Sequence, residues 1–478
     1  MATDVGRRQG VLVAVGALVC SAVLLYLGTG PAPIPALTWL APLPVLWLAP
    51  RVSARVALVV AFTAALAGTG NSWAYFLGSD SVPLLMVPVL ILCLSLLLML
   101  AVGLFRAMVV RDRPLAAAGA APAVWVGGLY LMSLASPVGV MGTLATTQGD
   151  LPVLLQTAAV TGWWGVEFLV LLVPAAVAAV LAPGIATAAR LRTGIAAALV
   201  LVAALGYGAL RQPDSTEARW RVAAIAQTAN KWATEITDPA GAELQRSYVD
   251  QIAALPDGVG LVVLPEAVFM VDEANTEALL GPFRQAAEAK GADVAVGALV
   301  RSAQGSKYNA VLGVPAAGGA PAVFRKWHVG VSPNTLSGDE LAHLPGGVGL
   351  QNCGDVNFPS PSREYALAGT SLVAVPGDDE DVDGWQHSRT AVLRGVENGM
   401  AMAWAATDGK TMISDGWGRV LAEDTTGGKP FAVAIADVPG GVGPTFYSEW
   451  GDWFAWLCLA MALAGTAFAL RRTPASQA

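Results

Sequence analysis

The sequence has little charge and little cysteine, and each shortage excludes a class of protein. Only 13% of the 478 residues are charged, whereas charged residues make up about a quarter of an average soluble protein. A disordered chain needs high charge and few apolar residues, so that class is excluded, as is the collagen-like class. Four cysteines are too few to cross-link a chain of this length as a disulfide scaffold. The net charge of −7 argues against a nucleic-acid partner, which would favour a basic face.

Long apolar runs are what the sequence has instead, and hydrophobic residues make up 55% of it. A helix needs about 20 mostly apolar residues to cross a hydrocarbon core of ~30 Å. The composition therefore predicts a polytopic α-helical membrane protein with about eight transmembrane helices, at 11 to 28, 34 to 50, 56 to 77, 82 to 105, 115 to 134, 160 to 182, 194 to 210 and 450 to 470. The predicted domains are a membrane domain (1–210), a polar domain (211–447) and a C-terminal transmembrane helix with a short tail (448–478).

Positive charge is confined to alternate connections between these runs. Short cytoplasmic loops collect Lys and Arg, and short translocated loops do not. The connections 29 to 33, 78 to 81 and 135 to 156 contain neither residue. The arginines lie at the opposite ends of the runs: Arg7, Arg8, Arg51, Arg55, Arg106, Arg111, Arg113, Arg190, Arg192, Arg471 and Arg472. This alternation predicts a multi-pass cell-membrane protein with both termini cytoplasmic, an extracytoplasmic polar domain, and a first run that is retained rather than cleaved as a signal peptide.

The polar domain alternates between short β-branched runs and helical stretches. Helices are predicted at 275 to 290 and 388 to 398, with Gly291 as the stop of the first. Strands are predicted at 221 to 226, 260 to 264, 292 to 300, 310 to 314, 347 to 353, 372 to 375 and 400 to 405. Such alternation is typical of a layered α/β or α+β domain.

Cys353 is the single cysteine of the polar domain, since the other three fall in apolar runs. A lone thiol in an oxidising compartment favours a nucleophile, with a buried structural cysteine as the alternative. Glu266 ends an apolar run and Lys326 follows a predicted strand, positions at which α/β domains present reactive groups. The three suffice for acyl transfer: Glu266 takes the thiol proton, the thiolate attacks a carbonyl, and Lys326 supports the oxyanion.

Three short motifs contain these residues: Leu264-Pro265-Glu266, Arg325-Lys326-Trp327-His328 and Asn352-Cys353-Gly354-Asp355. They resemble the catalytic motifs of the nitrilase (carbon-nitrogen hydrolase) superfamily, whose members use a Glu-Lys-Cys triad in a four-layer αββα sandwich. Seven spans before such a domain and one after it resemble one branch, the apolipoprotein N-acyltransferases. Stretches that also look similar to that family are 40 to 44, 161 to 169, 308 to 310, 386 to 397 and 406 to 419.

The resemblance implies a two-step reaction without a cofactor. Cys353 would take a fatty acyl group from a membrane phospholipid and pass it to the α-amine of the diacylglyceryl-cysteine of a lipoprotein. Both partners are anchored in the outer leaflet, so a thiol held over the membrane would meet them at high effective concentration. The resemblance also implies substrate-binding roles for Trp232, which matches a family Trp near the lipid-binding cavity, and for Gly354 and Asp355, which follow the nucleophile.

Two departures from the family pattern leave the substrate open. Asn334 occupies the place of an essential family glutamate in the substrate-binding region, with Asp339 or Glu340 as alternative carboxylates. The stretch from Lys326 to Cys353 is shorter than in most membrane relatives. The alternatives are a membrane-tethered amidase or acyltransferase with a different amine or amide substrate, and an inactive domain that binds or scaffolds a membrane partner.

No metal site is predicted. The acidic stretch 379 to 384 imitates the start of an EF-hand loop, but its twelfth position is Thr390 instead of a bidentate Glu, so a solvated acidic loop is the prediction. The three histidines lack metal-ligand spacing. Glu167 is an acidic residue inside a predicted span. It is either a functional carboxylate within the membrane or a side chain that reaches the interface or the underside of the polar domain, and the sequence favours neither.

Overall fold

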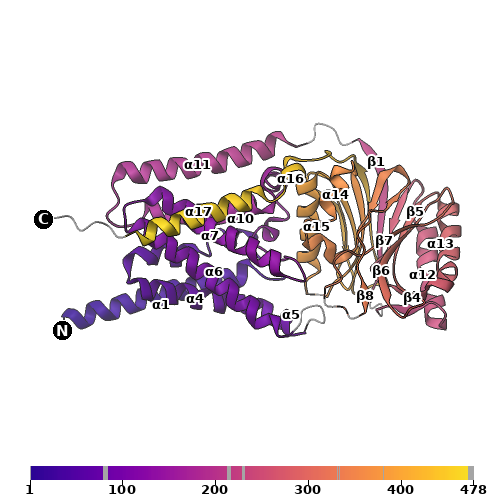
Figure 1. The fold of residues 1–478 in the computed structure, drawn as a ribbon, viewed down its shortest axis with the longest axis horizontal. Coiled ribbons are helices and arrows are strands. Elements are labelled where there is room, and N and C mark those ends of the chain that lie inside the picture. The colour runs from indigo at the N-terminus through magenta and orange to yellow at the C-terminus, as the bar shows by residue number, and fades with distance from the viewer. Residues whose placement is uncertain are drawn as a thin grey trace.

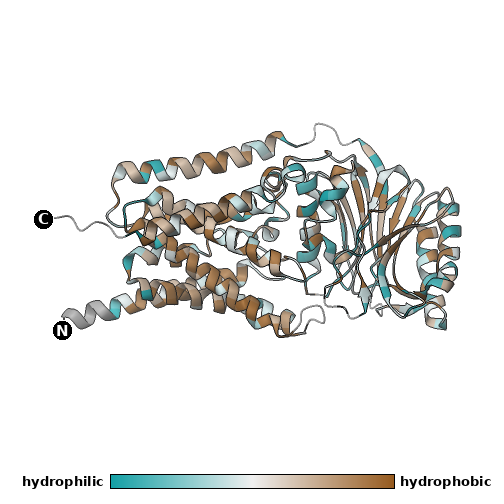
Figure 2. Ribbon diagram, viewed as in Figure 1, coloured by the Kyte–Doolittle hydropathy of each residue, from teal (hydrophilic) through white to brown (hydrophobic). Residues whose placement is uncertain are grey.

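The computed structural model describes residues 2–78, 84–212, 217–228, 232–330, 332, 334–380 and 382–471, without the side chains of residues 2–7 and 78. It has two parts, a helical bundle and a β-sandwich at one end of that bundle (Figure 1). The start of the first helix and the end of the last helix lie at the end of the bundle that faces away from the sandwich (Figure 1). Apolar residues dominate the bundle, whereas polar residues are frequent in the sandwich (Figure 2).

Seven helical segments within the described residues are long and apolar enough to cross a membrane. One of them is α4 continued by η2 and α5. Small residues let these helices pack closely, since Gly68 meets Leu25, and Gly127 meets the backbone of Leu459. Their bounds are α1 (Ala2–Gly28), α4 (Ala54–Gly68), η2 (Thr69–Ser72), α5 (Trp73–Gly78), α6 (Met86–Val109), α7 (Pro114–Ala135), α10 (Trp163–Val180), α11 (Thr187–Leu210) and α17 (Trp453–Leu470).

The predicted span 34 to 50 is not one helix. It is broken into α2 (Pro35–Thr38), α3 (Leu43–Leu48) and η1 (Ala49–Arg51). Pro35, Pro42 and Pro44 explain the break, because proline lacks the N–H that continues a helix and its ring collides with the preceding turn. A single transmembrane helix here is therefore a wrong prediction.

The broken segment nevertheless runs the length of the bundle. At its start Thr38 accepts a hydrogen bond of 2.9 Å from Gln148, close to Asp150, which pairs with Arg389 of the sandwich. At its end Arg51 donates one of 2.7 Å to the carbonyl of Leu181. Leu181 follows the last turn of α10, whose first turn contacts the sandwich. The segment thus joins the same two ends of the bundle as its long helices.

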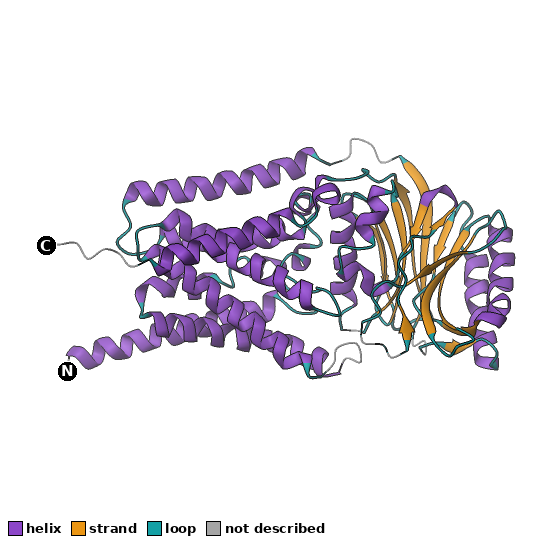
Figure 3. Cartoon of the chain, in the orientation of Figure 1, coloured by secondary structure: helices purple, strands orange, loops and turns teal. Residues whose placement is uncertain are grey.

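The polar part consists of two stacked sheets with helices outside each (Figures 1 and 3). One sheet has nine strands within the described residues, with the order β15-β1-β3-β5-β4-β2 and with β6 joining β7 and β8 to β5. Its strands are β1 (Ala218–Gln227), β2 (Thr234–Glu235), β3 (Leu261–Val263), β4 (Phe269–Asp272), β5 (Asp293–Arg301), β6 (Lys307–Val314), β7 (Ala322–Arg325), β8 (Thr335–Leu336) and β15 (Phe431–Pro439).

The second sheet has six strands within the described residues, in the order β14-β13-β12-β11-β10-β9. The helices α12 (Pro239–Ala254) and α13 (Thr276–Lys290) cover the first sheet, and α14 (Ser362–Leu367) and α15 (Gly384–Asn398) lie between the second sheet and the bundle (Figure 1). This four-layer sandwich on a helical membrane part confirms the predicted fold class. The strands of the second sheet are β9 (His343–Leu344), β10 (Val348–Leu350), β11 (Leu372–Asp378), β12 (Ala401–Thr407), β13 (Lys410–Ser414) and β14 (Val420–Thr425).

Alternation along the strands separates two cores. In β1, Val222 and Ala224 pack into the core between the sheets, whereas Ala223 and Ile225 pack under α12 and α13. Side chains of a strand point alternately to its two faces, so an apolar residue at every position is what a sheet covered on both sides requires. The apolar runs seen in the sequence are therefore the inner layers of the sandwich.

Polar contacts join the sandwich to the bundle. Glu397 of α15 accepts a hydrogen bond from the backbone N–H of Trp163, and Trp164 donates one of 2.7 Å to Asp452, just before α17. Glu167 is fully buried and accepts hydrogen bonds from Trp125 (2.9 Å) and from the N–H of Ala145 (2.8 Å). Its carboxylate thus ties α10 to α7 and to the loop beneath the sandwich.

Candidate active site

Glu266 lies in the turn between β3 and β4, and the neighbouring backbone fixes its position. Its N–H donates a hydrogen bond of 2.9 Å to the carbonyl of Gly377 on the second sheet. Gly297 of β5 passes so close that a Cβ there would lie 2.2 Å from the carbonyl oxygen of Pro265. The carboxylate is therefore held rigidly at the end of β3, and the side chain of Glu266 is only 2% exposed.

Lys326 follows β7 and reaches the same point. Its Nζ lies 2.7 Å from Oε1 of Glu266, and its N–H donates a 2.8 Å hydrogen bond to the carbonyl of Asn309. Burial alone would lower the pKa of Lys326, but the negative charge of Glu266, with smaller effects of Cys353 and Asp355, raises it above its usual value. The site therefore contains a permanent ammonium group beside a carboxylate.

Cys353 is the first residue of η6 (Cys353–Asn357), three residues after β10. The predicted strand 347 to 353 thus ends before the thiol. The backbone of Cys353 has φ = +34°, in the left-handed region that few non-glycine residues adopt, and such strain is typical of functional sites. Its Sγ lies 3.5 Å from the carbonyl oxygen of Asp378.

The thiol of Cys353 is protonated at rest. Burial and the negative charge of Glu266 raise its pKa well above the usual value, and the opposing effect of Lys326 is smaller. A buried thiol of this kind becomes a nucleophile only when a neighbouring base removes its proton during attack. Glu266 is the acidic residue with the largest effect on the pKa of the thiol, and it can act as that base.

Two amides connect the triad. Asn309 of β6 donates a 2.6 Å hydrogen bond to Oε1 of Glu266 and accepts one of 2.9 Å from Asn352, the residue before the nucleophile. Both side chains are buried. Each lies in a stretch that resembled the family, but nothing in the spacing showed that they touch, and sequence reasoning did not select them as site residues.

Both halves of the chain match known families. Residues 21–176 match the apolipoprotein N-acyltransferase N-terminal domain, and residues 209–447, half of the chain, match the carbon-nitrogen hydrolases. The chain belongs to the apolipoprotein N-acyltransferase family. The resemblance inferred from its motifs is therefore confirmed.

Individual relatives of this acyltransferase family are distant. An apolipoprotein N-acyltransferase of Gloeobacter violaceus is 27% identical over 402 residues, which cover 76% of this chain and 74% of the relative. One of Geobacter metallireducens is 34% identical over 145 residues, so the match spans only 28% of this chain and 27% of that relative. A solved structure that is similar is Nit3 of Saccharomyces cerevisiae, a member of the nitrilase superfamily. The match covers 46% of this chain and 91% of Nit3, with 18% identity and a TM-score of 0.40.

The substrate-binding residues predicted from the N-acyltransferase resemblance lie in different surroundings. Gly354 adjoins the triad, since a Cβ there would lie 3.9 Å from Nζ of Lys326. Trp232 is 53% exposed, and Asn334 is also exposed, with φ = +54°. No hydrogen bond between the side chain of either residue and the triad is found in the described part of the chain.

Asp355 is fully buried and faces the protein. Its Oδ1 accepts a 2.9 Å hydrogen bond from the N–H of His328 and lies 3.0 Å from Nδ1 of the same residue. The imidazole ring stacks on Phe358 at 3.7 Å between centroids. Asp355 thus clamps the segment after Lys326 to the segment after Cys353, a positioning contact that sequence reasoning did not anticipate.

A second group of titratable residues borders the triad at the end of β11. Asp379 lies 2.8 Å from Nδ1 of His387, and burial lowers the pKa of His387 to about 4. Burial, with a smaller contribution from Glu266, raises the pKa of Asp378 to about 8. Asp379 and Asp383 of the EF-hand-like stretch are buried, so the prediction of a solvated loop is wrong for them, and Asp381 lies outside the described residues.

Proposed function

We propose that this chain is an acyltransferase that moves a fatty acyl group from a membrane phospholipid, through a thioester on Cys353, to the N-terminal amine of a diacylglyceryl-cysteine lipoprotein. The observation that carries the proposal is that Glu266, Lys326 and Cys353 lie in one largely buried site, with Nζ of Lys326 2.7 Å from Glu266 and the Sγ of Cys353 3.5 Å from the carbonyl oxygen of Asp378. The family membership supports the acyl-transfer chemistry, and the bundle under the sandwich supports lipid substrates.

In the first step Glu266 takes the proton of Cys353 while the sulfur attacks the ester carbonyl of the phospholipid. The oxyanion forms beside the ammonium of Lys326, whose positive charge stabilises it. The carbon–oxygen bond then breaks, Glu266 returns the proton to the leaving alkoxide, and a lysophospholipid departs. The product is a thioester between Cys353 and the fatty acid.

In the second step the free amine of the diacylated acceptor attacks the thioester carbonyl. Glu266 takes a proton from the amine, the carbon–sulfur bond breaks, and Glu266 passes that proton to the thiolate of Cys353. Asn309 keeps the carboxylate oriented through both steps, since it binds the same oxygen that Lys326 binds. The sum is one acyl group moved from oxygen to nitrogen, and no cofactor is needed.

The first step can be tested by mass measurement. Purified protein is incubated with a phospholipid of one defined acyl chain and weighed intact. We expect a mass gain equal to that acyl group on Cys353, its absence in C353A, and its discharge as an amide on addition of a diacylated lipopeptide. Active protein that never carries the adduct would contradict the thioester mechanism.

A second candidate keeps the triad and changes the substrate. Asn334 replaces the family glutamate and is exposed, which favours a different amide or amine for a membrane-tethered amidase or acyltransferase. An acyl adduct that resists the lipopeptide but is discharged by water or by another amine would support this candidate. An inactive scaffold would instead show no adduct at all, with the cellular phenotype unchanged in C353A and K326A.

We also propose that the sandwich is extracytoplasmic and that both termini are cytoplasmic. Arginines support this orientation, because they gather at the end of the bundle away from the sandwich. Arg51 binds the carbonyl of Leu181, and Arg111 binds that of Ala469 at 2.7 Å. Such clustering is typical of the cytoplasmic face.

A further inference from the structure

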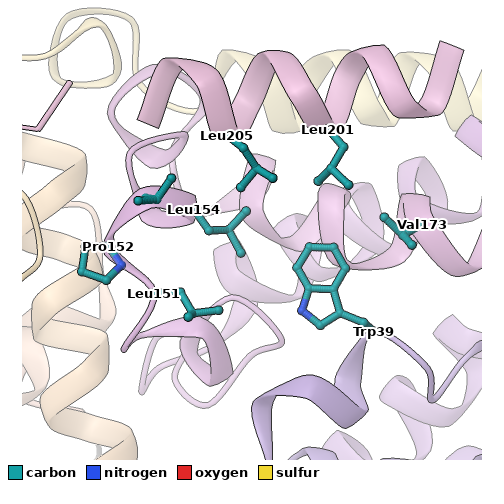
Figure 4. A pocket seen from close by; sticks show the side chains of 8 residues that line it. Trp39, Leu151, Pro152, Leu154, Val173, Leu201 and Leu205 are labelled. Carbon is teal, nitrogen blue, oxygen red and sulfur yellow. The ribbon is translucent and has the colours of Figure 1, made fainter. Parts of the chain in front are cut away.

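An apolar cavity lies between α11 and the rest of the bundle, in the half that adjoins the sandwich. Its volume is about 440 Å³. Figure 4 shows Leu201 and Leu205 pointing into it from α11, with Trp39 on the opposite side. The indole N–H of Trp39 is already bound to Gln148 at 2.9 Å, so the lining offers hardly any polar surface. The complete lining is Trp39, Leu151, Pro152, Val153, Leu154, Val173, Leu201 and Leu205.

The cavity is left open because the residues of α11 that pack on the bundle are small. Within this helix the buried residues are Thr193 and Gly208. At Gly208 the approach is so tight that a Cβ would lie 1.8 Å from the carbonyl oxygen of Val153. Between these two points Ala197 and Ala204 pack partly buried against the core of the bundle, and Leu205 remains 39% exposed. No side chain of the described residues fills the gap.

Hydrocarbon is the material that fills such a gap in a membrane. The cavity is open toward the surface of the bundle, where Leu205 is 39% exposed, so material from outside the protein can enter it. Water does not occupy it favourably, since even smaller apolar cavities stay dry and bind apolar molecules instead. α11 is one of the membrane-spanning helices, which places the gap at the depth of lipid acyl chains.

A cation marks the end of the cavity near the sandwich. Arg211 follows the last turn of α11, and the spacing of Leu201, Leu205, Gly208 and Arg211 places them along one face of the helix. The guanidinium of Arg211 donates a 2.5 Å hydrogen bond to the side-chain oxygen of the neutral Gln156. The amide nitrogen of Gln156 in turn binds the carbonyl of Trp417 in the sandwich. Within the part of the chain that the structure describes, Arg211 forms no ion pair, so its charge can meet an anion at the level of the lipid head groups.

We propose that this cavity, together with Arg211, is a binding site for one phospholipid, with an acyl chain between Leu201, Leu205 and Trp39 and the phosphate on the guanidinium. Its lining contains none of the three triad residues, so the lipid held there is a structural component that fixes α11 against the bundle. The proposal does not depend on acyl transfer, because it concerns a lipid that is bound and not consumed.

The experiment uses the full-length chain in the C353A background, so that no lipid is turned over. Protein is extracted from vesicles of phosphatidylethanolamine and phosphatidylglycerol that contain a phosphatidylglycerol with a photoreactive diazirine in one acyl chain. Native mass spectrometry counts retained phospholipid, and peptide mapping locates the photo-adducts. The variants are L205W, which fills the cavity, and R211Q, which removes the phosphate partner. The matched control is L199W, at a 64% exposed position of the same helix that does not line the cavity.

We expect one retained phospholipid in the parent and in L199W, with adducts on 151–154 and 201–205. L205W and R211Q should each lower the retained fraction about tenfold, as expected for the loss of the chain site or of a charge-assisted hydrogen bond. Equal retention in L205W and L199W, or adducts no denser in the cavity than at Leu199, would overturn the site. If L205W does not fold, L201F fills the same space, and unchanged retention in R211Q overturns the phosphate assignment.

Discussion

At the residue scale, Asn309 is an uncharged side chain that holds the geometry of the triad. It binds the base on one side and, through Asn352, the segment that begins with the nucleophile on the other. Because Glu266 and Lys326 share a buried site, a small rotation of the carboxylate would bring it closer to the ammonium and away from the thiol. Asn309 opposes that rotation.

We therefore expect N309A to slow acyl-enzyme formation about 10- to 100-fold, because a hydrogen bond to a charged group is worth ~1.5–3 kcal/mol. The rate is read from the growth of the acyl adduct by mass spectrometry. N275A is the control, since Asn275 precedes α13 without a side-chain capping bond and should leave the rate unchanged. Equal rates in N309A and N275A would remove Asn309 from the mechanism.

Asp378 gives the site a predicted pH dependence. Its pKa is raised to about 8 by burial and then by Glu266, so it is neutral below that pH and ionised above it. Ionisation adds a negative charge that interacts with Glu266, on the residue whose backbone carbonyl contacts the thiol of Cys353. The added charge disfavours the thiolate. The acylation rate of the parent should therefore fall as the pH rises above about 8, and D378N should not show this fall.

D424N serves as the control for that measurement, because Asp424 lies on β14 and is bound to Lys429 at the surface. Its pH profile should match the parent's. Identical alkaline limbs in the parent and D378N would show that another group governs the high-pH behaviour.

The sequence predicted Glu266, Lys326 and Cys353 as site residues because each stands at a strand end next to an apolar run. Asn309 lies inside a strand and has no such marker, and its role depends on pairing between β5, β6 and β7. The contact between Asp355 and His328 could not be predicted from the sequence either. The two are separated by 26 residues, many of them in loops without regular secondary structure. Long-range contacts of this kind follow from tertiary structure and not from local pattern.

At the element scale, β5 supports the turn that carries the base. Gly297 lies where a Cβ would be 2.2 Å from the carbonyl oxygen of Pro265 and 2.6 Å from Cα of Glu266. Both contacts are to backbone, which cannot move aside without moving the turn. G297A should therefore displace Glu266 and lower the acylation rate about 100-fold, the scale of effect of a 1 Å misplacement.

G281A is the matched control for G297A. Gly281 is inside α13, and a Cβ there meets nothing within 4 Å. The change should keep the rate and stabilise the fold by about 0.5–1 kcal/mol, because alanine loses less conformational entropy in a helix. Thermal unfolding in detergent provides the stability measurement. A G297A protein with the parent's rate would show that the turn is adaptable.

Elements with a strong local signal were predicted and weak ones were not. Gly291 has φ = +70° after α13, as expected of a helix stop. In the sandwich the predictions missed the helices α12 and α14 and the strands β2, β4, β7, β8, β9, β13, β14 and β15. In β14 the pattern is polar and half-exposed, so no apolar run marks it. The broken span 34 to 50 was predicted as a helix from its hydropathy, which reports only that its residues are apolar. Its prolines, which hydropathy does not take into account, break the helix.

At the scale of the whole molecule, eight segments run the length of the bundle, seven long helices and the broken segment 35 to 51, among the described residues. An even number of crossings returns the chain to the side on which it began. The termini should therefore share a compartment, and the sandwich, which follows the seventh crossing, should lie in the other.

Reporter fusions test this arrangement. Green fluorescent protein fused after residue 478 should fluoresce, and alkaline phosphatase at the same place should be inactive, as expected of a cytoplasmic end. Alkaline phosphatase fused after residue 217 should be active. The opposite result at residue 478 alone would mean that α17 does not cross. The opposite result at both places would mean either that the orientation is reversed or that the broken segment does not cross.

The broken segment also has a consequence for how the protein is made. Its carbonyl groups are bound by distant side chains: Ser21 of α1 binds the carbonyl of Ala41 at 2.6 Å, and Gln148 binds that of Pro35 at 3.3 Å. Backbone groups left unbound in hydrocarbon cost several kcal/mol each. Gln148 is synthesised more than 100 residues after Pro35. We therefore expect the segment to take its final place in the membrane only after Gln148 has been synthesised.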